Sequence, residues 1–220
     1  LSLCDVDIGA AARRVVCGAQ NFVGGDLVAF ATEGTVLPDG LVVLDVERPR
    51  TAGRKTAAYK LDLTQPTASA RLGEVLRAER VDALAHLAFL SRPTRAEPWA
   101  HELESVGTMH VLNGCREANV PRLLAISSTL LYGPHASNPN FLVESHPLRG
   151  IRGCSFLADK IEAEAQIQRF AEERPETNVT VLRLATMLGP TSRTWITKWL
   201  SRRLVHTKIG FDPPVQLVHD

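Results

Sequence analysis

Short apolar runs alternate with amphipathic segments along most of this 220-residue chain. A short apolar run bounded by Gly, Pro or acidic residues predicts a buried strand, and apolar residues at helical spacing predict a helix. The runs predict strands at 14–17, 41–45, 57–61, 81–88, 123–127 and 179–184. The amphipathic segments predict helices at 26–33, 68–79, 99–119, 155–173 and 192–204. This alternation predicts an α/β fold, a doubly wound parallel sheet with helices on both faces.

The stretch 14–24 predicts a phosphate site at the start of this fold. Gly18 permits a tight turn after the first strand, and Gly24 allows the helix that begins near Phe22 to pack closely on the sheet. A helix start offers free backbone N–H groups and a positive dipole end. Asp45 ends the second strand, about 20 residues past Gly24, which is the spacing expected for a carboxylate that binds ribose hydroxyls. Together these features predict a dinucleotide site.

Composition narrows the classes of function. The chain is 45% hydrophobic and 22% charged, as soluble globular proteins are, and its net charge of +1 gives no electrostatic case for a nucleic acid. It has no apolar run long enough for a membrane helix, and its His and Cys residues lack metal-ligand spacing, so we expect no membrane segment and no metal site. Cys17 and Cys115 fall on apolar positions of predicted elements, which indicates reduced core thiols. A cytoplasmic protein is the expectation.

Several motifs, in order, resemble one protein family. They are residues 18–24 (GAQNFVG), Asp45, Leu61-Asp62-Leu63, Val81-Asp82, His86-Leu87-Ala88, Val106-Gly107-Thr108, residues 126–133 (ISSTLLYG), Lys160 and residues 181–190. This series resembles the extended short-chain dehydrogenases/reductases, the NAD-dependent epimerase/dehydratase family that acts mostly on nucleotide sugars. The resemblance implies a Rossmann fold over 14–190, after an unassigned segment 1–13. Residues 191–220 would begin a C-terminal substrate domain that is largely missing, because both ends of the chain look truncated.

The resemblance also implies a cofactor site for NAD. Asp45 would bind both ribose hydroxyls and repel a 2′-phosphate, which favours NAD, although Arg48 leaves NADP open. Asn21 stands where the family has its middle glycine, so we expect reduced affinity. The implied cofactor-binding residues are Gly18, Gln20, Asn21, Phe22, Val23, Gly24, Asp45, Asp62, Leu63, Leu87, Ala88 and Lys160.

The resemblance implies a catalytic site with one essential change. Ser128 matches the serine that hydrogen-bonds the reacting oxygen, and Lys160 matches the lysine that follows the catalytic tyrosine by four residues. The tyrosine position holds Phe156, which has a ring and no hydroxyl to transfer a proton. Tyr132 is a possible substitute. Other candidates are Cys154, Asp159, His135 and His146, and Ser105 is a further departure, at a position where the family often has Asn.

Two functions therefore remain open. The first is an atypical NAD-dependent epimerase, dehydratase or dehydrogenase acting on a nucleotide sugar, with an unidentified group moving the proton. The second is a catalytically silent NAD(P)-binding sensor or scaffold. The expected partner is a small molecule rather than a nucleic acid or a membrane, and family resemblance implies a homodimer formed through helices 99–119 and 155–173.

Overall fold

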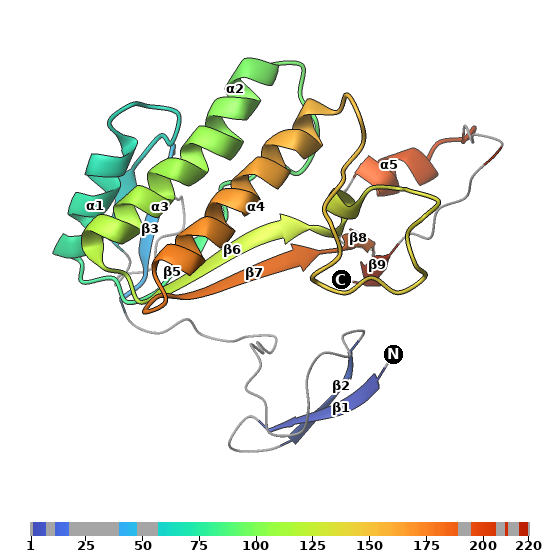
Figure 1. Ribbon diagram of the computed structural model, residues 1–220, viewed down its shortest axis with the longest axis horizontal. Helices are drawn as coiled ribbons and strands as arrows, with labels where there is room; N and C mark the ends of the chain where they lie inside the picture. Colours follow the sequence, from blue (N-terminus) through green and yellow to red (C-terminus); the bar gives the residue numbers. More distant parts are fainter. Residues whose placement is uncertain are drawn as a thin grey trace. The chain divides into compact units, whose positions relative to one another are not determined.

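A computed structural model of the chain describes residues 2–7, 12–17, 40–47, 57–188, 195–205, 210 and 216–219. It divides into two compact units, Leu1–Asp39 and Gly40–Asp220. Figure 1 shows the described elements in sequence colours. The predicted segments 18–24 and 26–33 lie outside the described residues.

The described part of the first unit is a two-stranded antiparallel sheet. Strand β1 (Ser2–Asp7) pairs with β2 (Ala12–Cys17), with Ser2 opposite Cys17 and Asp7 opposite Ala12. A strand therefore covers the predicted range 14–17, but it pairs antiparallel with β1, whereas the sequence predicts a strand of the parallel sheet. Its partner β1 comes from the segment 1–13, for which the sequence predicts no element.

The second unit contains parallel strands, as the sequence predicts. Strand β3 (Val42–Asp45) pairs with β4 (Ala57–Lys60). Strands β5 (Leu84–His86), β6 (Arg122–Ser128) and β7 (Asn178–Leu184) form a parallel sheet in that order. A further parallel pair, β8 (Thr186–Leu188) and β9 (Leu217–His219), has no counterpart in the sequence prediction.

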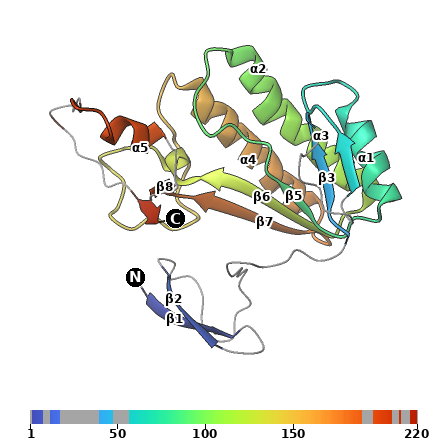
Figure 2. The same cartoon turned by 180° about the vertical axis from the view of Figure 1, so that it is seen from behind.

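The described α-helices fall within or close to the predicted ranges 68–79, 99–119, 155–173 and 192–204, while the 3-10 segment at 129–132 lies where no helix is predicted. The helical segments are α1 (Ala68–Ala78), α2 (Glu97–His101), the π-helical segment η1 (Glu102–Val106), α3 (Gly107–Ala118), the 3-10 segment η2 (Thr129–Tyr132), α4 (Ser155–Glu173) and α5 (Trp195–Leu200). α2, η1 and α3 run continuously over the range predicted as one helix, 99–119. Helices α1, α3 and α4 lie side by side, with α3 and α4 over one face of the β5–β6–β7 sheet (Figures 1 and 2).

The core lies between this helical layer and the sheet. Leu72, Val75 and Leu76 of α1 are buried, as their spacing predicts. Leu123 and Ala125 are buried on the helix-facing side of β6. The core also buries Cys115 of α3 as a free thiol, and burial raises its pKa to about 12. This packing sets the positions of the side chains that α3 and α4 direct toward each other.

Candidate functional site

A buried ion pair joins η1 and α4. Lys160 of α4 places its Nζ 2.9 Å from Oε1 and 3.1 Å from Oε2 of Glu104 in η1. The two side chains are only 8% and 1% exposed. The rings of Phe89 and Phe156 lie 5.1 Å and 5.0 Å from the same ammonium, within the range of a cation–π contact. The lysine implied to bind cofactor is thus surrounded by one carboxylate and two aromatic rings.

The Glu104 carboxylate is also fixed from the β5 side. The backbone N–H of Leu90 donates to its Oε1 at 2.5 Å. Burial raises the pKa of Glu104, while the charge and hydrogen bonds of Lys160 and the bond from Leu90 act in the opposite direction. These three donated hydrogen bonds stabilise the charged carboxylate against the cost of burying it.

A neutral histidine lies beside this pair. His86, at the end of β5, shares a 3.2 Å hydrogen bond with the hydroxyl of Thr108. That hydroxyl donates to the carbonyl of Glu104 at 2.6 Å, so the ring Nε2 of His86 carries the hydrogen that it donates to Thr108. Burial, helped by the charge of Lys160, lowers the pKa of His86 to about 4. His86 therefore acts as a structural donor.

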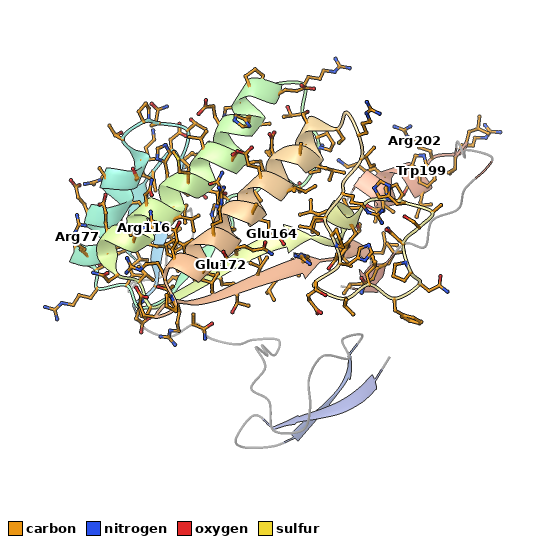
Figure 3. All side chains as sticks on the ribbon, viewed as in Figure 1. Arg77, Arg116, Glu164, Glu172, Trp199 and Arg202 are labelled. Carbon is orange, nitrogen blue, oxygen red and sulfur yellow. The ribbon has the colours of Figure 1, made fainter. Side chains whose placement is uncertain are left out.

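A second buried ion pair connects α4 to the strands. Glu164, labelled in Figure 3, is almost fully buried and accepts from Arg183 of β7, with Nε at 2.8 Å. It also accepts from Ser127 of β6 at 2.5 Å. Arg183 in turn donates to the Tyr132 hydroxyl at 2.7 Å and to the Glu144 carbonyl at 2.7 Å. The Tyr132 hydroxyl thus belongs to a hydrogen-bond network that links η2 to β7 and α4, and this network gives it a structural role.

Ser128 ends β6 and starts the η2 segment. Its Oγ accepts the backbone N–H of Leu130 at 3.2 Å, as an N-cap does. Because the oxygen is the acceptor in this bond, the hydroxyl hydrogen is left to donate elsewhere. Ser128 lies at the carboxyl end of β6, the middle strand of its sheet, and ligands bind at this end in parallel α/β sheets.

The implied cofactor residues divide into two groups. Gly18, Gln20, Asn21, Phe22, Val23 and Gly24 lie outside the described residues. Asp45 is exposed at the end of β3, where it accepts the N–H of Glu47 at 3.3 Å.

Asp62 binds the N–H of Thr64 at 3.0 Å and its hydroxyl at 2.7 Å, bonds that lower the pKa of Asp62. Leu63 is buried in the core. Leu87 and Ala88 follow β5 as exposed residues, with Leu87 65% exposed.

The other titratable candidates have partners of their own. His135 bonds the Gly150 carbonyl at 2.9 Å, and His146 lies 3.3 Å from Asn138 Oδ1. Asp159 pairs with Nδ1 of His101 at 2.9 Å. These contacts fix the loop 135–153 and the α2–α4 junction, and they give each group a structural role.

Glu104 is the residue that the sequence prediction missed. The sequence does contain a signal for it: Glu104 precedes Thr108 by four positions and shares the helix face of Thr108, Val111 and Cys115. An acid on a buried helix face requires a buried cation or donor. Ser105 is buried and accepts from Gln166 of α4 at 3.0 Å.

The parallel strands and the helical layer define an α/β protein of the Rossmann type. The chain belongs to the NAD-dependent epimerase/dehydratase family, whose family model matches residues 14–220. An uncharacterised protein of Mycobacterium tuberculosis is 29% identical over 214 residues, which is 94% of this chain and 55% of that protein. The chain thus spans about half the length of the curated relatives that match nearly all of it.

Solved structures share the fold. A DesIV dTDP-glucose 4,6-dehydratase of Streptomyces venezuelae, solved with NAD bound, matches with a TM-score of 0.58 at 23% identity and covers 70% of this chain and 49% of its own. A UDP-Glc/GlcNAc 4-epimerase of Campylobacter jejuni matches with a TM-score of 0.57 at 18% identity and covers 76% and 51%. At this level of identity the match establishes the fold alone.

A second set of relatives shares only a short segment. A putative tRNA-binding protein of Bacillus subtilis is 40% identical over 75 residues, which is 33% of this chain and 36% of that protein. Phenylalanine–tRNA ligase beta subunits also match, one of them from Sulfurimonas denitrificans with 48% identity over 46 residues. These matches have a higher sequence identity than the match to the Mycobacterium tuberculosis protein, but they cover far fewer residues.

Among the described residues, no helix has both the length and the apolar character that crossing a membrane requires.

Proposed function

We propose that this chain is the nucleotide-binding part of an atypical NAD-dependent epimerase/dehydratase-like protein that binds NAD and a nucleotide-sugar-type ligand without tyrosine-based proton transfer. One observation carries this proposal: the Phe156 ring lies 5.0 Å from the Lys160 ammonium, where the family places its tyrosine. A benzene ring neither accepts nor donates the proton that an alcohol must lose as it is oxidised. Losing one member of a catalytic unit removes most of its rate acceleration.

An active oxidoreductase is the second candidate. Ser128 favours it, because its hydroxyl keeps a hydrogen to donate to a ligand oxygen at the carboxyl end of β6. Bound NAD would supply the hydride-accepting ring, and Asp45 and Asp62 would hold its adenosine half. The proton would then need a base other than residue 156.

Ligand titration separates these candidates. We expect NAD to bind in calorimetry and NADP to bind more weakly, because the Asp45 carboxylate would repel a 2′-phosphate. With UDP-glucose or dTDP-glucose, chromatography of the sugar nucleotide should show no conversion. Conversion of the sugar nucleotide by the parent chain would favour the oxidoreductase. If calorimetry detects binding of neither NAD nor NADP, both candidate functions are overturned.

A substitution at Asp45 tests the cofactor site itself. Asp45→Ala removes a carboxylate that would accept two ribose hydroxyls, and hydrogen bonds to charged groups contribute roughly 1.5–3 kcal/mol each. We expect NAD affinity to fall at least about tenfold. The matched control is Glu47→Gln, which removes a charge from an exposed acid two positions away and should leave NAD affinity unchanged. Equal NAD affinity in the Asp45 variant and the parent would contradict the role of Asp45.

A further inference from the structure

We propose that Glu104 is the residue that silences Lys160: it neutralises the ammonium, so that a tyrosine restored at position 156 would still not ionise near neutral pH. This inference rests on the proposed function and deepens it, because it identifies a second change at the same site. The sequence reveals the missing hydroxyl of Phe156, whereas the role of Glu104 follows only from its contacts.

The contacts of the ammonium leave little of its charge uncompensated. Both carboxylate oxygens of Glu104 lie within hydrogen-bond distance of Nζ, at 2.9 Å and 3.1 Å. Two of the three ammonium hydrogens are therefore directed at one carboxylate. The rings of Phe89 and Phe156 flank the same group. Since the pair is buried, water does not separate these charges.

This neutral pair changes what a tyrosine at position 156 would experience. A nearby cation lowers the pKa of a phenol because it stabilises the phenolate, and burial raises that pKa. A close ion pair presents almost no net charge to its neighbours, so the lowering effect is lost while the effect of burial remains. In Phe156→Tyr alone, the phenol pKa should thus stay at or above the ordinary value of about 10.

Glu104→Gln is the substitution that removes the charge with the least change in shape. The amide keeps the size of the side chain and one oxygen that can accept from Lys160 and from the N–H of Leu90. The positive charge of Lys160 then acts on residue 156 without compensation. The matched control is Glu102→Gln, which removes the same charge from an exposed position in the same η1 segment.

The experiment is a spectroscopic titration of the phenolate in F156Y, F156Y/E104Q and F156Y/E102Q. The chain has two native tyrosines, and subtracting the matching chain with Phe156 isolates the new phenol. We expect a phenol pKa of about 10 or higher in F156Y and F156Y/E102Q, and a value lower by at least about one unit in F156Y/E104Q. Equal values in the two double variants would overturn the proposal.

F156Y by itself keeps the proposal testable if the double variant does not fold. It adds one hydroxyl and leaves the Glu104–Lys160 pair intact, and a phenol pKa clearly below about 9 in this variant would show that Lys160 is not neutralised. Calorimetry with NAD on the same proteins separates the two claims. Absence of NAD binding with the expected order of pKa values would remove the proposed function and leave the role of Glu104 standing.

Discussion

At the scale of single residues, burial decides what each titratable group does. His86 and Glu104 are conventional acid–base residues by type, yet both are buried, and their hydrogen bonds are directed at other protein groups. Asp45 is exposed at a strand end, where a ligand can reach it. A buried carboxylate is thus held by protein donors, whereas an exposed one stays accessible from the solvent.

His86 predicts a loss of stability on the acid side. Its pKa is lowered from 6.5 to about 4 in the folded chain, so the unfolded chain binds the proton more tightly. The stability contributed by neutral His86 is complete above pH 6.5 and falls as the pH drops toward 4, by about 3 kcal/mol in total. His86→Gln should flatten the fall in urea-unfolding free energy over this range. An unchanged pH profile would contradict the prediction.

The Arg183–Glu164 pair predicts a large difference between buried and exposed ion pairs. Arg183→Met leaves Glu164 buried and without its cation, a change that costs roughly 3–5 kcal/mol. The control is Arg71→Met, which breaks an exposed pair with Glu74 within α1 and costs about 1 kcal/mol or less. Chemical unfolding of both variants measures the difference. Similar losses would show that Glu164 relies on its other partners.

At the scale of helices and strands, packing of α1 on α3 depends on one glycine. A Cβ added at Gly114 of α3 would lie 2.8 Å from Cγ and Cδ2 of Leu72, which is buried in α1. The Leu72 side chain has little room to move away, because it is packed within the core. Gly114 therefore sets how closely the two helices approach.

Matched glycine substitutions test this packing. Gly114→Ala should lower the free energy of unfolding by roughly 1–3 kcal/mol because of overpacking. Gly73→Ala, in α1, should be neutral or raise it by up to about 1 kcal/mol. The one close approach of its Cβ is to Oε2 of Glu117, the far end of a long side chain, while Arg77 Nη1 and Glu117 Cβ lie at 3.4 Å, and alanine favours the helix. Thermal or chemical unfolding gives both values. A stabilised Gly114→Ala would show that the helices can separate at little cost.

Most elements of the second unit could be predicted from the sequence. Helix 155–173 was predicted with its observed bounds, because its apolar positions are regular and local. Strand β5 is shorter than the predicted 81–88, since hydrogen bonding to β6 and not hydropathy ends it at His86. The pair β8–β9 was missed because its strands are three residues long and far apart in the sequence.

At the scale of the whole molecule, two observations give different starts for the main domain. The structure divides the chain after Asp39, whereas the family model matches from residue 14 onward. The predicted limits 1–13, 14–190 and 191–220 therefore stay predictions. The short matches to tRNA-related proteins raise a further question for the whole chain. Their higher identity indicates a shared segment, and charge is the physical property that bears on nucleic-acid binding.

We predict that the chain does not bind tRNA. Its 25 Lys and Arg side chains are balanced by 24 Asp and Glu side chains, so the chain has almost no net charge to attract phosphates. Fluorescence anisotropy with labelled tRNA at low salt should show no saturable binding, with a basic tRNA-binding protein as the positive control. Tight binding that weakens steeply with added salt would contradict the prediction and identify a second function.

The sequence by itself determined the alternating parallel α/β order and the absence of a hydroxyl at Phe156, because periodicity is local and the composition of a side chain does not depend on folding. Only the tertiary structure decided that Lys160 meets Glu104, 56 positions away. An acid on a buried helix face requires a buried cation or donor, but the sequence does not show which residue fulfils that role. Lys160 reaches Glu104 because α4 packs beside η1, and the apolar faces of the helices and the sheet determine that packing.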